Sequence, residues 1–191
     1  MKVNTKKLTS IGVLAGISYV LMMILEFPLP FMPPFLKLDL STVPALIAGF
    51  MFGPVAGVLV ALVKDLLHLL STQTGGVGEL ADFICTTVIV VLSSTVYFKN
   101  KTRKGALMGL VLGTFGITVV GALVNMYILI PFYSKIKPIE AIFDACGNIN
   151  PYIGSLSTYV LFGAAPFNFI KGVILSAITM LLYKRISKIF R

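Results

Sequence analysis

Long apolar stretches without charge, separated by short basic clusters, constrain this chain more than any other feature of its sequence. The charge-free runs are Leu8–Leu25, Leu40–Val63, Phe83–Phe98, Gly105–Ser134 and Ala145–Ile170. Hydrophobic residues make up 57% of the 191 residues and charged residues only 12%, with a mean hydropathy of +0.97. A soluble domain is closer to half apolar and a quarter charged. The sequence therefore predicts an all-α integral membrane protein, formed as a single domain over residues 1–191.

Basic residues gather at three places, each next to an apolar run. They are Lys2, Lys6 and Lys7; the loop Lys99–Lys104; and Lys184, Arg185, Lys188 and Arg191. Cytoplasmic loops of membrane proteins carry an excess of Lys and Arg, so both termini and the middle loop are predicted to be cytoplasmic. The net charge of +9 therefore reflects orientation in the membrane, and nucleic-acid binding is not expected.

This charge pattern requires an even number of membrane crossings between the cytoplasmic points. The run Leu40–Val63 supplies the missing crossing if the chain turns at Phe52-Gly53-Pro54, because Gly and Pro together interrupt helices. We therefore predict six transmembrane helices, over residues 8–26, 40–52, 55–70, 80–98, 105–131 and 165–184. The extracellular loops are then residues 26–39, 71–82 and 131–164. The last of these is too long for a plain connector, so we expect it to act as a lid or binding loop.

A lysine inside the last apolar stretch is the most informative single residue. Lys171 follows Asn168 by three positions, so both side chains share one helix face. A cation at a helix centre costs roughly 2.5–3.5 kcal/mol on insertion scales. The other polar residues of the predicted spans fall towards the same, extracellular ends: Lys64, Asp65, His68, Glu79, Asp82 and Asn125. The cytoplasmic half is expected to bury almost no polar side chains, which favours an outward-facing pocket over a channel with polar lining along its whole length.

Several of these residues also have a structural interpretation. Lys171 either lines the pocket, snorkels to the interface or forms an ion pair with Asp65 or Asp82. Asn125 either contacts a ligand or bonds another helix of the bundle. The glycine-rich segment Thr74–Glu79 lacks the Lys-Ser/Thr ending of a P-loop. Its glycines either let the backbone approach a ligand or form a turn.

Catalysis is poorly supported by the sequence. The single histidine, His68, has no evident serine or cysteine partner and lies near a predicted helix end, where an interfacial position is expected. Cys85 and Cys146 lie in different contexts, which argues against a disulfide, and no metal-ligand spacing is present. We therefore expect a binding or transport protein without a cofactor or metal, whose energy comes from a partner.

Four motifs, in order along the chain, resemble the riboflavin-specific substrate-binding subunit (S component) of energy-coupling-factor (ECF) transporters. They are Leu36–Ser41 (LKLDLS), Lys64–Leu70 (KDLLHLL), Thr74–Asp82 (TGGVGELAD) and Pro166–Gly172 (PFNFIKG). The resemblance runs nearly end to end and implies six helices with both termini cytoplasmic, in a bacterial plasma membrane. It implies riboflavin as the transported ligand and, as partners, a membrane coupling subunit and two ATPase subunits.

The resemblance also implies roles for individual residues. Lys171 and Asn168 suit the pyrimidine edge of the flavin ring, whose carbonyl and N–H groups need donors and an acceptor. Asn125, Glu79 and the backbone near Gly76 suit the ribityl hydroxyls, and the opposite assignment of the two ends stays open. The apolar slot for the flavin ring and its lid are expected from the first extracellular loop, residues 26–39, which is rich in proline. Leu38, Asp39 and Leu40, in the motif at the end of this loop, are expected to take part.

The first span carries small residues of the kind that let a partner helix approach closely. Gly12, Ala15 and Gly16 are the expected docking residues for the coupling subunit, with packing inside the chain as the alternative. Two other functions remain open: an S component for a different vitamin, and a small intramembrane enzyme acting on lipid or isoprenoid. The enzyme would need an acid/base pair or metal motif in mid-membrane.

Overall fold

The structure is a computed structural model that describes the chain except residues 1–4, 31, 34–35, 73, 137 and 190–191. The side chains of residues 183–184 and 186–189 also lie outside the described part. Among the residues named above, Lys2 and Arg191 are therefore outside the described residues, as are the side chains of Lys184 and Lys188.

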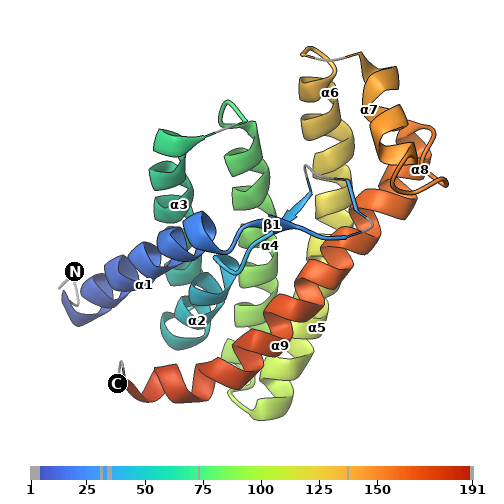
Figure 1. The fold of residues 1–191 in the computed structure, drawn as a ribbon. Helices are drawn as coiled ribbons and strands as arrows, with labels where there is room; N and C mark the ends of the chain where they lie inside the picture. Colours follow the sequence, from blue (N-terminus) through green and yellow to red (C-terminus); the bar gives the residue numbers. More distant parts are fainter. Residues whose placement is uncertain (1–4, 31, 34–35, 73, 137, 190–191) are drawn as a thin grey trace.

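Helices make up almost all of the regular structure (Figure 1). The helices before the middle loop are α1 (Thr5–Ile24), α2 (Thr42–Phe52), α3 (Pro54–His68) with the short 3-10 turn η1 (Leu69–Ser71), and α4 (Val77–Lys99). Those after it are α5 (Arg103–Val124), η2 (Asn125–Leu129), α6 (Ile130–Tyr133), α7 (Ile139–Gly147), α8 (Leu156–Tyr159), η3 (Val160–Ala164) and α9 (Ala165–Ile189). Two short antiparallel strands, β1 (Phe27–Pro28) and β2 (Lys37–Leu38), pair between α1 and α2.

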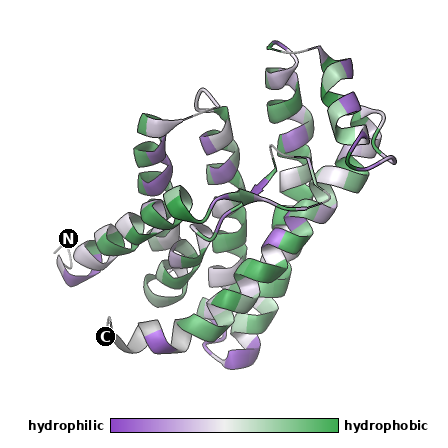
Figure 2. Cartoon of the chain, viewed as in Figure 1, coloured by the Kyte–Doolittle hydropathy of each residue, from purple (hydrophilic) through white to green (hydrophobic). Residues whose placement is uncertain are grey.

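Five helical stretches within the described residues are long and apolar enough to cross a membrane. They are Thr5–Ile24, Pro54–Ser71, Val77–Lys99, Arg103–Tyr133 and Leu156–Leu182, and Thr42–Phe52 is a shorter apolar helix. Hydrophobic residues cover these helices, whereas hydrophilic residues gather at the α4–α5 turn and near the upper ends of α3 and α4 (Figure 2). The chain is thus an all-α membrane protein.

The turn predicted at Phe52-Gly53-Pro54 is present. Gly53 has a φ of 100°, a left-handed value that favours glycine, and Pro54 opens α3 at its first position. The α2 and α3 helices then pack so closely that a Cβ on Gly57 would lie 2.5 Å from the carbonyl oxygen of Ala45. One apolar run therefore forms two helices, as the charge pattern required.

The main hydrophobic core joins α1–α5 and α9. Fully buried aliphatic side chains fill it, among them Leu46, Ile47, Ile89, Leu110 and Leu175. A second cluster lies above it, where the tip of the β1–β2 hairpin packs under the lobe formed by α6, α7 and α8. In that cluster burial raises the pKa of the Cys146 thiol to about 11, so the residue acts there as a small neutral side chain.

The expectation that the cytoplasmic half buries almost no polar side chains is wrong. Ser93, Ser94, Thr114 and Thr179 are all buried in the half of the bundle nearer the α4–α5 turn. The Thr114 and Ser176 hydroxyls lie 3.1 Å apart across α5 and α9. Small hydroxyl residues fit such helix–helix contacts because they allow close approach, so they contribute to the packing between helices.

The last long helix begins at Leu156, earlier than the start expected at residue 165. Ser155 caps it: its hydroxyl accepts from the Thr158 backbone N–H, and the Thr158 hydroxyl accepts from the Ser155 N–H. This capping box starts a helix immediately after a segment whose Pro and Gly residues are typical of a loop. A wide π-helical turn, η3, then joins α8 to α9.

We predict that Gly57→Ala destabilises the protein by about 1–3 kcal/mol, because the added methyl group overlaps backbone that cannot move away easily. The measurement is the thermal unfolding midpoint of purified protein in detergent. Gly12→Ala is the matched control, since a Cβ there meets nothing within 4 Å and alanine favours the helix. Equal midpoints for the two variants would contradict the packing described for α2 and α3.

Candidate functional site

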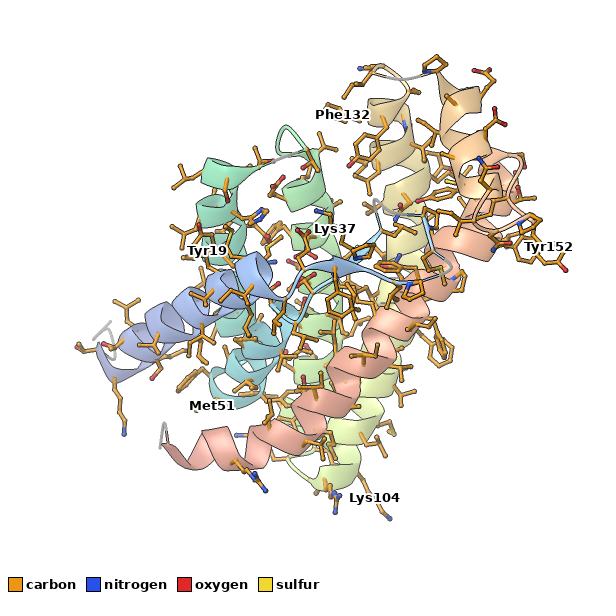
Figure 3. All side chains as sticks on the ribbon, in the orientation of Figure 1. Tyr19, Lys37, Met51, Lys104, Phe132 and Tyr152 are labelled. Atoms are coloured by element: carbon orange, nitrogen blue, oxygen red, sulfur yellow. The ribbon has the colours of Figure 1, made fainter. Side chains whose placement is uncertain are left out.

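A cavity of about 590 Å³ lies between the upper parts of α3, α4 and α5 and the start of α9. The end of α1 and the β1–β2 hairpin form its remaining wall, and Lys37, on the strand that crosses in front of α4, is one of its lining residues (Figure 3). Its size falls within the roughly 300–1,000 Å³ of typical small-molecule sites. Five of the predicted ligand residues line it together: Asp39, Glu79, Asn125, Asn168 and Lys171.

Lys171 forms two buried ion pairs at the base of this cavity. Its Nζ donates to Asp39 Oδ2 at 2.8 Å and to Asp82 Oδ1 at 2.9 Å. The ion-pair interpretation of the sequence is therefore realised with Asp82, and Asp39 is a second partner. An ammonium has three N–H donors, so these two bonds leave one for a group inside the cavity.

A second lysine extends the ion pairs away from the cavity. Lys64 is fully buried and contacts Asp82, Asp65 at 2.8 Å and the Ser41 hydroxyl at 3.3 Å. Neither Lys64 nor Asp65 lines the cavity. Both therefore have a structural role, and Asp65 pairs with Lys64 instead of Lys171.

This buried network links four parts of the chain: the segment after β2, α3, α4 and α9. Its members are two ammonium groups and three carboxylates. Removing one partner from a buried ion pair costs about 3–5 kcal/mol, because the remaining charge is left without compensation. The network therefore fixes the base of the cavity while Lys171 still faces its interior.

Two asparagine amides form the wall beside Lys171. Asn168 Nδ2 donates to the Ala164 carbonyl oxygen, and Asn125 Nδ2 donates to the Gly121 carbonyl oxygen, both at 2.8 Å. Each asparagine adjoins a π-helical turn, Asn125 at the start of η2 and Asn168 shortly after η3. Wide turns of this kind occur often at functional sites. The two asparagine side chains use part of their hydrogen-bonding capacity on their own helices, and the rest is left for the cavity.

Asn125 has a further partner that the sequence did not indicate. The hydroxyl of Tyr159, a fully buried residue, donates to Asn125 Oδ1 at 2.6 Å. The interpretation that Asn125 bonds another helix is thus realised, and it is compatible with a place in the cavity wall. Tyr159 was missed because its segment was expected to be loop, which gives no reason to direct a side chain inwards.

The upper end of the cavity is polar as well. Glu79 Oε1 lies 2.9 Å from His68 Nδ1, and Glu79 Oε2 accepts from the Thr74 hydroxyl at 2.9 Å. His68 lines the cavity instead of lying only at the interface. Its spacing of four residues from the buried Lys64 indicates only that His68 lies on the inward-facing side of α3.

Three predicted ligand residues do not line the cavity. Gly76 has a φ of 88° and precedes α4, so its glycine is required by the turn itself. Leu38 is buried within β2, and Leu40 packs against the main core. Strand alternation and core packing direct these two side chains away. The apolar lining comes instead from residues that the sequence did not single out: Met22, Met23, Val124, Leu129 and Phe167.

The small residues of α1 lie on two different faces. Gly12 and Gly16 are exposed, and a Cβ on either would meet nothing within 4 Å. Ala15 is buried in the main core with 1% exposure. Ala15 therefore packs inside the chain, at a position about 60° around the helix axis from Gly12 and about 100° from Gly16.

Comparison with known proteins agrees with this architecture. The family model for the ECF transporter, substrate-specific component, matches residues 6–183. The riboflavin transporter RibU of Staphylococcus aureus (strain TCH60) is 36% identical over 188 residues, which cover 98% of this chain and 94% of the relative. The riboflavin transporter FmnP of Bacillus subtilis (strain 168) is 33% identical over 183 residues, covering 94% and 91%.

A solved structure of the S component of a bacterial ECF transporter has the same fold. It superposes with a TM-score of 0.78 at 34% identity and covers 99% of both chains. The match of the family model over nearly the whole chain, together with this fold, gives the assignment: the chain belongs to the substrate-specific components of ECF transporters.

Proposed function

We propose that the chain captures riboflavin in the cavity described above, as the substrate-binding subunit of an ATP-driven importer. The observation that carries this proposal is the convergence of Lys171, Asn168 and Asn125 in the lining of one cavity that also has an apolar wall. The names of the relatives as riboflavin transporters support it. The chain is a transport component of a bacterial plasma membrane and not an enzyme.

Riboflavin joins a flat tricyclic ring to a polyhydroxyl tail, so its site needs a flat apolar surface and two polar ends. Phe167, Met22 and Met23 supply apolar and polarizable surface for the ring. The free N–H of Lys171 and the amide of Asn168 suit the carbonyl and N–H groups of the pyrimidine edge. Glu79 and Asn125 suit the tail hydroxyls, with His68 beside them.

The proposed orientation has six crossings, with α2 as the short one and both termini in the cytoplasm. The α4–α5 turn carries Lys99, Lys101, Arg103 and Lys104, which favours the cytoplasmic side. Lys101 Nζ lies 4.8 Å from the centre of the Phe98 ring, an arrangement suited to the membrane interface. The cavity then opens to the outside, with the α6–α8 lobe and the β1–β2 hairpin above it.

Uptake in this proposal requires a membrane coupling subunit and two ATPase subunits. The exposed face of α1 around Gly12 and Gly16 is the proposed contact for the coupling subunit, because glycines let another helix approach closely. Ala15, which is buried, supports that face from inside the chain.

Protein purified without added ligand is expected to be yellow, because a high-affinity site retains flavin through purification. After the flavin is removed, added riboflavin should lose fluorescence in proportion to the protein present. Riboflavin analogues should compete with riboflavin for the site, and other vitamins should not. Colourless protein that leaves riboflavin fluorescence unchanged would falsify the riboflavin assignment and leave another vitamin as the ligand.

Lys171→Ala is expected to lower both stability and riboflavin affinity. Stability should fall by about 3–5 kcal/mol, because Asp39 and Asp82 lose their buried partner. The double variant Lys171→Met with Asp39→Asn removes one charge of each sign and should recover much of the unfolding midpoint. Its riboflavin affinity should stay at least about tenfold low, a loss of about 1.4 kcal/mol, with Asp39→Asn alone as the control. Wild-type affinity in the double variant would mean that Lys171 has only a structural role.

Replacing both Gly12 and Gly16 with leucine should leave riboflavin binding and the unfolding midpoint unchanged, since the added side chains point into open space. Uptake into vesicles that contain the complete transporter should be lost, because the bulky side chains keep the coupling subunit away. Gly154→Leu, at another position with nothing within 4 Å of a Cβ, serves as the control. Full uptake by the leucine variant would show that the partner binds elsewhere.

A further inference from the structure

Gly121 of α5 lies where both cavity asparagines meet the backbone. Its carbonyl oxygen accepts from Asn125 Nδ2 at 2.8 Å. A Cβ at this position would lie 2.5 Å from Asn168 Oδ1 and 2.6 Å from Asn168 Nδ2. Real Cβ atoms do not approach other atoms so closely, so the Asn168 amide occupies the space that any other residue would fill.

The atoms in the way at Gly121 differ from those at Gly57 and Gly109. At Gly57 and Gly109 the added Cβ would strike a backbone carbonyl oxygen, of Ala45 and Ser93 respectively. At Gly121 the three nearest atoms all belong to the Asn168 amide, the end of a flexible side chain. The fold depends on the close packing at Gly57. At Gly121, by contrast, it is the position of the Asn168 amide that depends on the contact.

The amide of Asn168 is held on two sides. Its Nδ2 donates to the Ala164 carbonyl oxygen at 2.8 Å, and its flat face rests against Gly121. The remaining N–H and the Oδ1 lone pairs are then available to the cavity, which Asn168 lines and Gly121 does not. Both residues are buried, so protein atoms support the amide on both of these sides.

We infer that Gly121 is a positioning residue for the bound ligand: its missing side chain seats the Asn168 amide against α5 and so sets the direction in which that amide meets the ligand. The inference rests on the proposed function, with riboflavin in the cavity. An alanine at 121 would push the amide off α5 and rotate its donor and acceptor away from the flavin edge.

The test measures riboflavin affinity, by fluorescence quenching in detergent, for the wild type, Gly121→Ala, Asn168→Ala and the double variant. Each single change is expected to weaken binding about tenfold, since each removes the same hydrogen bonds to the ligand. The double variant should bind no more weakly than Asn168→Ala, because a methyl group at 121 has room once the amide is gone. Wild-type affinity in Gly121→Ala, or losses that add in the double variant, would overturn the inference.

Gly116→Ala is the matched control on the same helix. A Cβ there would overlap Leu92 Cδ1, also the end of a flexible side chain, but neither residue lines the cavity. Its riboflavin affinity should equal that of the wild type. If Gly121→Ala fails to fold, the double variant decides: a folded double variant supports the inference, and an unfolded one overturns it. A wild-type protein that binds no riboflavin would instead overturn the proposed function, before any variant is compared.

Discussion

The buried contact of Lys171 with Asp39 and Asp82 is the interaction on which the rest of the site depends. It joins α9 to α4 and to the segment that leads from the β1–β2 hairpin into α2. A lone ammonium in an apolar bundle is unfavourable, and so is a lone carboxylate. Bringing them together lets a strongly polar surface exist at the base of the cavity, with the main hydrophobic core directly below. The hairpin is held by the same charges, so the wall that it forms and the base of the cavity are parts of one assembly.

The polar residues of the site have structural and binding roles at the same time. Lys171 spends two N–H groups on carboxylates, and Asn125 and Asn168 each spend one on a carbonyl oxygen of their own helix. Such partial satisfaction fixes a side chain without using all of its hydrogen-bonding capacity. A ligand then meets groups that are already oriented, which reduces the entropy lost on binding. The alternatives left open by the sequence, ion pair or ligand contact, therefore do not exclude one another here.

Local patterns in the sequence predicted much of this, and distant contacts did not follow from them. The break at Gly53 and the shared face of Asn168 and Lys171 depend only on neighbouring residues, and both are present. The pairing of Lys171 with Asp39 joins positions 132 apart, and no periodicity indicates such a contact. The early start of the last helix was missed because residues 131–164 were expected to form a loop, whereas the Ser155 cap decides the boundary. Tyr159 was overlooked for the same reason.

The two wide turns, η2 and η3, each hold one residue more than an ordinary helical turn would at the same place. One residue corresponds to about 100° of rotation around a helix axis. The turn in η3 thus determines which face of α9 is directed towards α5. It thereby determines the direction in which the side chains of Asn168 and Lys171 point. In a related chain, the loss of a single residue from such a turn would rotate the rest of the helix. A different face of that helix would then point inwards. The effect of that loss on the site would exceed that of most substitutions, although the helix itself would remain just as apolar and would be only one residue shorter.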